Sequence, residues 1–255
     1  MKLSVSVGLL QDLRFAISIA LLPTLRTVLH SPLLLFRPHA LSRKFMSHVW
    51  AQYGNGIDGN TQGIKESLIK PNVRGVVFDI GAGHSHTVKY LPADKVTKYV
   101  ALEPNTLMHD EIRKLASEYG FTEDSGKLSI ILYCAGDINL IISALGGEHS
   151  VDTLISILSL CSIPSAESVI QALVDHVLKP GGQFLFYEHV RHPREDIAWW
   201  QWFWTPVWKR AFDGCCLDRP THLWIDAMPV WESKELDTQD EEPEEHLFPH
   251  RIGSG

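Results

Sequence analysis

The chain has 255 residues, of which 45% are hydrophobic and 21% charged, a composition that argues against a disordered or fibrous protein. Its formal net charge is −7, but residues 1–50 hold six basic side chains and one acid, a balance of +5, so the other 205 residues carry −12. An acidic body argues against nucleic acid as a partner, because phosphate binding needs clustered Lys and Arg. The four cysteines show no C-x-x-C pair or zinc-ligand spacing, which predicts a reduced compartment and no metal site.

Residues 1–40 form a basic, mostly apolar segment. Two prolines, Arg26 and His30 interrupt the apolar stretch from Phe15 to Phe36, which makes it marginal as a spanning helix of about 20 apolar residues. No clean cleavage site for a secretory signal follows it. Two interpretations remain for this segment. It anchors the chain to an anionic membrane surface as a helical hairpin broken at proline, or it packs on the following domain as an ordinary helix.

From residue 41 to residue 255 strands and helices alternate, which predicts a parallel sheet with helices on both faces. The expected strands are Val76–Ile80, Lys98–Glu103, Leu128–Tyr133, Val151–Leu158 and Gln183–Val190. The expected helices are a short one ending at Leu91, then Asn105–Tyr119, Ile138–Leu145 and Ala166–Leu178. The predicted fold class is therefore α/β, with a doubly wound, Rossmann-like sheet. In such sheets a ligand binds at the carboxyl ends of the strands.

Two segments near the end of the chain are unusual in composition. Five aromatic residues fall within Trp199–Trp204, and they cannot all face one core from a helix. We predict that residues 196–217 form a helical lid over the acceptor site that also touches lipid; the alternative is that half of these side chains belong to an ordinary core. The acidic run within residues 237–246 predicts a solvated loop.

The main functional motif follows the first strand and contains Asp79, Gly81 and Gly83. Glycines at a strand-to-helix turn let the backbone approach a ligand closely. A dinucleotide fingerprint G-x-G-x-x-G would need a third glycine at position 86, where this chain has His86. The methyltransferase pattern D/E-x-G-x-G-x-G is met except at Ser85, another small residue. This pattern favours S-adenosylmethionine (SAM) over a dinucleotide as the cofactor.

Further candidate cofactor residues follow the next strands. Glu103 ends the second strand, where an acid can accept both ribose hydroxyls. Asp137 and Ile138 follow the third strand, so that the Asp137 carboxylate could accept the adenine amino group and the Ile138 amide could meet the ring. Ser156, near the end of the fourth strand, completes the set predicted to bind the cofactor. With these elements in this order, the chain resembles the class I SAM-dependent methyltransferases, whose sheet has seven strands.

A closer resemblance rests on Leu160–Ile163, Tyr187–Val190 and Phe212–Cys215. These motifs resemble the membrane-associated thiol S-methyltransferase-like family, in a fungal-type form. The resemblance implies methyl transfer to a small, apolar thiol or hydroxyl acceptor, such as a secondary metabolite. It also implies a cytosol-facing chain anchored through its N-terminus to the endoplasmic reticulum or lipid droplets; the alternative is a soluble cytoplasmic protein. That family ends in a full final strand, whereas this chain stops at Gly255, so a short last strand is expected.

Methyl transfer from a sulfonium needs an acceptor held in line, and no metal in principle. The candidate base is His189, at the end of the fifth strand, since an imidazole can take a proton from a thiol or hydroxyl; the alternative is a structural histidine. Two other functions stay open. One is a degenerate, membrane-tethered SAM-binding or scaffold protein, and the other is a nucleotide-dependent oxidoreductase, which His86 and Asp137 disfavour. The acceptor and the oligomeric state are left open.

Overall fold

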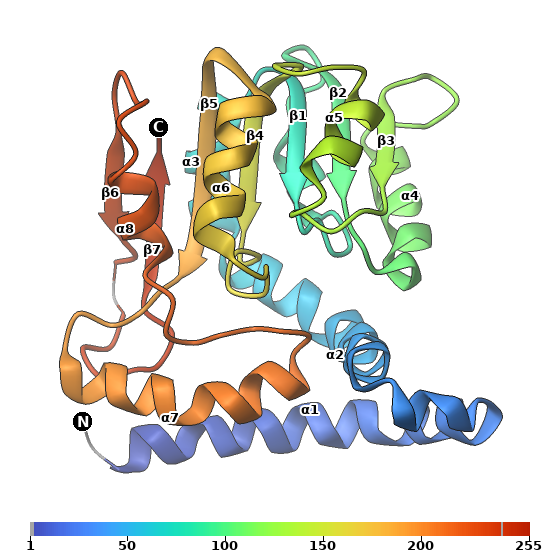
Figure 1. Cartoon of the computed structure of the whole chain (residues 1–255), viewed down its shortest axis with the longest axis vertical. Helices are drawn as coiled ribbons and strands as arrows, with labels where there is room; N and C mark the ends of the chain where they lie inside the picture. Colours follow the sequence, from blue (N-terminus) through green and yellow to red (C-terminus); the bar gives the residue numbers. More distant parts are fainter. Residues whose placement is uncertain (1–2, 241) are drawn as a thin grey trace.

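The computed structural model describes residues 3–240 and 242–255. Its centre is a seven-stranded sheet of order β3-β2-β1-β4-β5-β7-β6 (Figure 1). The strands from β3 to β5 in this order are parallel, and β7 runs antiparallel to β5 and β6. The strands are β1 (Gly75–Ile80), β2 (Val96–Leu102), β3 (Leu128–Ile131), β4 (Val151–Ile157), β5 (Leu178–His189), β6 (Glu235–Thr238) and β7 (His250–Ser254). The doubly wound seven-stranded sheet is confirmed.

Helices cover both faces of the sheet and its carboxyl edge. The α-helices are α1 (Leu3–His30), α2 (Pro38–Asn60), α3 (Gln62–Asn72), α4 (His109–Glu118), α5 (Ile138–Leu145), α6 (Ala166–His176), α7 (Glu195–Ala211) and α8 (Thr221–Asp226). The 3-10 turns are η1 (Pro32–Phe36), η2 (His86–Tyr90) and η3 (Thr106–Met108). One face of the sheet packs against α5, α6 and α8, and the other against α3 and α4.

The central strands are apolar on both sides because both faces are covered. Phe78 and Leu154 point into the core under α5 and α6, and Val77 and Ile155 point into the core under α3 and α4. Successive side chains of a strand alternate between faces, so a strand buried on both sides reads as a continuous apolar run. The loops after these strands converge at the carboxyl edge, which is where the sequence predicts a ligand.

A helical layer, made of α1, α2 and α7, lies beyond that carboxyl edge (Figure 1). The buried residues of α1 are Leu9, Ala16 and Ala20, a helical stripe that packs with Val49 of α2 and Trp208 of α7 in one apolar cluster. The α1 helix continues through Pro23. The chain breaks after His30, and α2 then packs back against α1 as a helical hairpin.

Much of this layer is apolar on its outer side as well. Val7–His30 of α1 is long and apolar enough, with a mean hydropathy of 1.3, to cross a membrane by length and composition. Leu29 is 79% exposed and Phe36 in η1 is 84% exposed. The large exposed side chains of α7 are Trp199, Trp202, Phe203 and Val207. These helices thus expose an unusual amount of apolar surface.

The fifth strand is longer than expected. The sequence predicts a strand that starts at Gln183. Instead β5 begins at Leu178, and the intervening residues form a bulge between two pairs with β4, Val151 with Leu178 and Thr153 with Gln183. Gly181 adopts a φ of +71° there, which a glycine accepts without strain.

Among the other boundaries that differ, two bear on the candidate site. The helix expected to start at Asn105 begins as the 3-10 turn η3, because the Asn105 side chain accepts the Leu107 amide and favours a tight turn. The α-helix itself starts at His109. The third strand ends at Ile131 rather than Tyr133. Both differences lie at the carboxyl edge, where the chain leaves the sheet to form the candidate site.

Candidate active site

The loop after β1 leaves no room for side chains at its glycines. Gly81 and Gly83 adopt φ angles of +67° and +56°, in the left-handed region. A Cβ on Gly81 would lie 2.7 Å from Ser159 Cβ, and one on Gly83 would lie 2.8 Å from Trp50 Nε1. The Gly81 amide donates to the Leu102 carbonyl at 2.9 Å, which ties the loop to the end of β2. The two glycines therefore form a bare backbone cradle.

Glu103 faces this cradle from the end of β2. One carboxylate oxygen accepts the Gly83 amide at 2.8 Å and the other accepts the Asn105 amide at 2.8 Å. Burial raises the pKa of Glu103 to about 7, although these two amides favour the ionised form. A carboxylate has more lone pairs than these two bonds use, so it can also accept ligand hydroxyls. The glycine loop and Glu103 are thus joined directly, and contact of Glu103 with a cofactor stays a prediction.

Asp79 lies beneath the loop. Its side chain is buried and accepts the Tyr99 hydroxyl at 2.7 Å, with Thr87 as a second partner. Burial raises the pKa of Asp79 to about 6 against these hydrogen bonds. Asp79 thus links β1, β2 and the turn η2, and it helps hold the glycine loop in place.

The other predicted cofactor residues differ in their surroundings. Asp137 and Ile138 lie at the start of α5, and the Asp137 carboxylate accepts the Cys134 amide at 3.0 Å. Ser156 is fully buried, and its hydroxyl donates to Glu188 at 2.7 Å. Ser156 therefore joins β4 to β5 in the structure, and its contact with a cofactor stays a prediction.

Helix α2 lies over the glycine loop. Its Trp50 borders a cavity of about 30 Å³ together with Asp79 and His86. A second cavity of about 460 Å³ lies between α2 and α4, bordered by His84, His86 and Leu107. Small-molecule sites measure about 300–1,000 Å³, so of these two cavities the second lies within that range and the first does not. Trp50 packs directly against the cradle.

Several polar atoms around the cradle lack partners. Trp50 Nε1 and His86 Nε2 are buried and make no hydrogen bond within the described residues. A buried donor without a partner costs about 1–3 kcal/mol, which a ligand with polar groups would recover. Together with the bare loop and the Glu103 carboxylate, these atoms fit a nucleoside ligand such as SAM.

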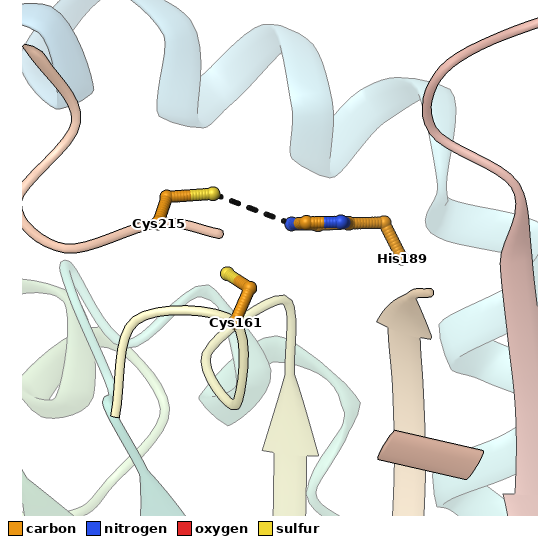
Figure 2. A group of neighbouring side chains, drawn as sticks. All are labelled: Cys161, His189 and Cys215. Carbon is orange, nitrogen blue, oxygen red and sulfur yellow. Dashed lines mark hydrogen bonds between the residues drawn. The ribbon is translucent and has the colours of Figure 1, made fainter. Parts of the chain in front are cut away.

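A cluster of two cysteines and one histidine lies beside this site. Cys161 follows β4, His189 ends β5 and Cys215 follows α7, and their side chains point toward one another (Figure 2). Their sulfur and nitrogen atoms lie within 4.8 Å of one another. A hydrogen bond from Cys215 lowers the pKa of Cys161 well below its usual range, against the effect of burial. Burial alone would lower the pKa of His189, but the Cys161 sulfur raises it.

The loop that carries Cys161 is held by hydrogen bonds from β5. One carboxylate oxygen of Glu188 accepts the Ser156 hydroxyl at 2.7 Å, the Ser159 amide at 2.9 Å and the Leu160 amide at 3.2 Å. Burial raises the pKa of Glu188 to about 7. Ser159 also contacts the glycine loop, so the cluster and the cradle are neighbours.

Of the predicted lid segment, residues 196–211 lie in α7, which has a buried and an exposed side, and residues 212–217 follow the helix. Trp208 is buried, whereas Trp199 and Trp202 are 50% and 62% exposed. The fully buried Gln201 donates to the carbonyls of Val190 and Leu247 at 3.0 and 3.1 Å. These bonds fix α7 across the end of β5.

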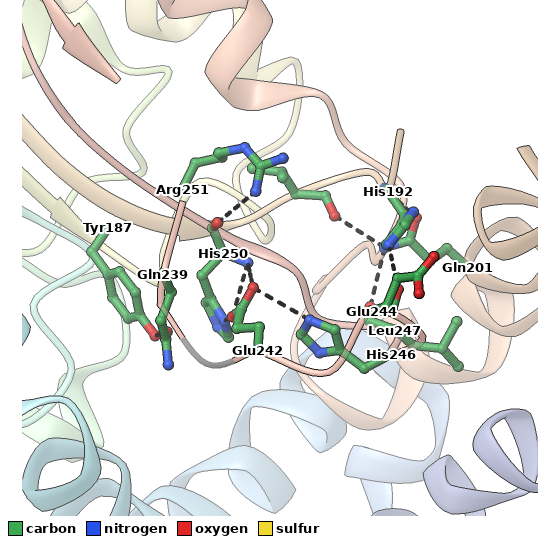
Figure 3. Close-up of polar contacts among 11 residues, drawn as sticks. Tyr187, His192, Gln201, Gln239, Glu242, Glu244, His246, Leu247, His250 and Arg251 are labelled. Atoms are coloured by element: carbon green, nitrogen blue, oxygen red, sulfur yellow. Dashed lines mark hydrogen bonds and ion pairs between the residues drawn. The ribbon is translucent and has the colours of Figure 1, made fainter. Parts of the chain in front are cut away.

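The predicted acidic loop lies against β5 and α7 (Figure 3). Of residues 237–246, Glu241 lies outside the described residues. Glu242 is turned inward: it bonds to His250 Nδ1 at 2.6 Å and forms an ion pair with His246 at 3.3 Å. Burial alone would raise the pKa of Glu242, but the two histidines lower it to about 2. The loop therefore anchors β7, the short last strand, beside β5.

Several residues of the site were not predicted from the sequence. Arg43 and Trp50 come from α2, and Asp213 forms an ion pair with Arg43 at 3.6 Å. Helix α2 carries an apolar stripe at helical spacing that could have shown it, formed by Phe45, Met46, Val49, Tyr53 and Ile57. No local spacing could have joined Cys161 to Cys215, because they come together only in the fold.

Comparison with known proteins identifies the same region. The family described as "Methyltransferase domain" matches residues 78–186, from β1 into β5. Over 80 residues the chain is 45% identical to thiol S-methyltransferase TMT1B of Homo sapiens, a match that covers 31% of this chain and 32% of that protein. An O-methyltransferase family protein from Burkholderia thailandensis has a TM-score of 0.57 at 13% identity, covering 84% of this chain and 59% of that chain. For a SAM-dependent methyltransferase from Leishmania major the TM-score is 0.55 at 16% identity, covering 85% and 82%.

The sequence match spans about a third of the curated relative's length, and the likeness to the two solved structures is one of fold. The family match includes the glycine loop, Glu103 and the loop of Cys161, the parts that shape the site. Residues 78–186 are therefore similar to this methyltransferase family, and the fold of the chain is similar to that of the two solved structures.

Proposed function

We propose that this chain transfers the methyl group of SAM to a small, apolar acceptor, with a thiol as the first choice and a hydroxyl as the second. The observation that carries the proposal is the hydrogen bond between the Gly83 amide and Glu103 at the carboxyl edge of the sheet. It joins a bare backbone surface to a carboxylate, the two features that a nucleoside ligand needs. The name of the similar human protein supports the choice of a thiol.

Each group at the site has a distinct part in this proposal. Glu103 would accept the ribose hydroxyls, the loop of Gly81 and Gly83 would pack against the sulfur side, and Asp137 would meet the adenine. SAM supplies an electrophilic methyl group on a sulfonium sulfur. The acceptor would enter beside Cys161 and His189, next to the cradle. There His189 would help the acceptor lose its proton.

The outer side of the helical layer supports a second part of the proposal. The exposed apolar side chains of α1, η1 and α7, with Phe36 at 84% and Trp202 at 62%, suit the headgroup region of a bilayer. We infer that these helices rest on a membrane surface, so that an apolar acceptor is drawn from lipid. The cytosolic face of the endoplasmic reticulum or of lipid droplets is the location that the family resemblance implies.

The experiment uses the purified full chain in mild detergent. Binding of S-adenosylhomocysteine is measured by calorimetry, and transfer of labelled methyl from SAM is then measured with a panel of thiols, phenols, carboxylates and amines. We expect binding, and transfer to thiols first. The Asp79→Ala variant should lose both, while Asp110→Ala, a change at an exposed residue of α4, should leave both unchanged. Thermal unfolding of each variant separates a lost site from a lost fold.

Three results would contradict this function. Binding without transfer to any acceptor would favour a scaffold protein. Binding of a nicotinamide dinucleotide in place of S-adenosylhomocysteine would favour an oxidoreductase. Equal binding by wild type and Asp79→Ala would contradict binding of the cofactor at the glycine loop.

A further inference from the structure

We propose that Cys161, His189 and Cys215 bind a zinc ion and leave one coordination position open for the acceptor thiol. Binding of an acceptor at the open position rests on the proposed function, whereas binding of zinc does not. Zinc prefers sulfur and nitrogen ligands in tetrahedral geometry, and sites with three protein ligands keep the fourth position for a substrate or water. Two cysteines and one histidine are such a set.

The distances fit this geometry closely. Zinc bonds of about 2.0–2.3 Å at tetrahedral angles place ligand atoms about 3.5–3.8 Å apart. Cys215 Sγ lies 3.4 Å from His189 Nε2, and all three ligand atoms lie within 4.8 Å of one another. Shifts of about 1 Å or less, within the reach of side-chain rotation, therefore complete three corners of a tetrahedron. Figure 2 shows the three side chains arriving from three separate segments.

The backbone around the cluster is fixed from both sides. The Cys216 amide donates to the Cys161 carbonyl at 3.0 Å, and Arg219 donates to the Leu160 carbonyl at 2.7 Å. Gly214 has a φ of +94°, and a Cβ there would lie 3.0 Å from the Ser162 carbonyl oxygen. The two cysteine loops are thus locked together, as a preorganised metal site requires.

The charges also suit a buried ion. Two cysteine thiolates neutralise Zn²⁺, and a neutral imidazole adds no charge, so the filled site buries no net charge. Cys161 and His189 are each at least 95% buried, as their exposed fractions of 3% and 5% show. An added acceptor thiolate would bring one negative charge beside the positive sulfonium, which balances it.

The chemistry of the acceptor follows from coordination. A thiol that binds zinc loses its proton, which passes to solvent, because a coordinated thiol is deprotonated outright. The thiolate sulfur then forms a bond to the methyl carbon, and the bond from that carbon to the cofactor sulfur breaks with its electron pair left on that sulfur. The product is a neutral thioether, a weaker ligand that can leave. His189 would assist proton loss by holding the metal.

The test measures metal binding before any activity. The full chain is reduced, stripped with a chelator and titrated with Zn²⁺ against a coloured chelator, and Co²⁺ is used as a visible probe of sulfur ligation. We expect one zinc per chain and a sulfur-to-cobalt absorption band. We expect zinc binding to weaken by about 10–100-fold or more in each of the variants Cys161→Ser, His189→Gln and Cys215→Ser. A loss of that size is already seen when a residue that only contacts a metal ligand is changed. Cys134→Ser, at an exposed free cysteine far from the cluster, should bind as wild type does.

The open position is tested on the cobalt form of the wild type, which needs no variant. An alkyl thiol should shift the cobalt spectrum, while its methyl thioether should not. A reduced wild-type chain that binds neither metal overturns the site, even if it binds S-adenosylhomocysteine. Zinc binding without a thiol-dependent shift overturns the open position. Zinc binding in a chain that does not bind S-adenosylhomocysteine supports the metal site and contradicts the proposed function instead.

Discussion

The carboxyl edge of the sheet and the helical layer beyond it differ in one respect, which is how far apart in the sequence their hydrogen-bonded residues lie. At the sheet edge the Gly83 amide bonds to Glu103, a separation of 20 residues. In the helical layer the Ser42 hydroxyl donates to the Arg210 carbonyl, a separation of 168 residues. The first region is built from one strand–loop–strand unit, and the second from distant parts of the chain. Hydrogen bonds hold the sheet edge together. The helical layer is held by apolar packing, and apolar side chains continue onto its outer surface.

The largest expected effect is on the cofactor side. In Gly83→Ala the new methyl group would meet Trp50, so we expect S-adenosylhomocysteine binding to weaken by more than about 100-fold, or about 2.7 kcal/mol. Gly126→Ala is the matched control, because Gly126 also has a positive φ but nothing lies within 4 Å of its Cβ position. Both variants should lose about 1–2 kcal/mol of stability to backbone strain. Calorimetry and thermal unfolding separate the two effects; equal binding by both variants would show that the cradle is not the site.

The next effect is a dependence of cofactor binding on pH. Burial raises the pKa of Glu103 to about 7, and the ionised carboxylate is the form that accepts ribose hydroxyls. Affinity for S-adenosylhomocysteine should therefore be constant above about pH 7 and fall about tenfold per pH unit below it. Glu103→Gln should bind weakly with no such slope, and calorimetry between about pH 5 and about pH 8.5 checks both. A slope that persists in the variant would assign the titration to another group.

The same shift has a consequence for stability with the opposite sign. The folded pKa of Glu103 lies above its ordinary value of 4.5, so the folded chain holds this proton more tightly than the unfolded chain. The carboxyl therefore lowers the free energy of unfolding as the pH rises from about 4.5 to about 7. Cofactor binding and stability should move in opposite directions across that range.

The smallest expected effect concerns the helical layer. The double change Trp199→Ser and Trp202→Ser removes two rings that are 50% and 62% exposed, and it should weaken binding to anionic vesicles by about tenfold. Leu132→Ser is the control, because Leu132 is 57% exposed after β3, away from the layer. Vesicle sedimentation gives the bound fraction. An equal loss of vesicle binding in both variants, or no loss in either, would contradict contact between α7 and the membrane surface.

The sheet and the cofactor edge could be predicted because their information is local. Buried parallel strands read as apolar runs, and Asp79, Gly81, Gly83 and Glu103 lie at the ends of two neighbouring strands. The structure places these residues around one loop. The bulge before Gln183 could not be predicted, because it depends on how β5 pairs with β4.

The helical layer and the cysteine cluster could not be predicted in the same way. Spacing along the chain gives no sign of this cluster, because Cys161, His189 and Cys215 meet only in the fold. The inward position of Glu242 was also missed, because an acidic run gives no sign of the histidines that bind one of its members. Contacts of this kind depend on the whole fold.

The position of Trp50 against Gly83 sets a limit on how quickly ligands exchange. The cavity beside the loop measures about 30 Å³, close to the share of one water molecule in the liquid. Under the proposed function, Trp50 must therefore move away from Gly83 before a molecule of nucleoside size can bind at the loop. The proposed function then implies that turnover cannot exceed the rate at which Trp50 leaves the loop.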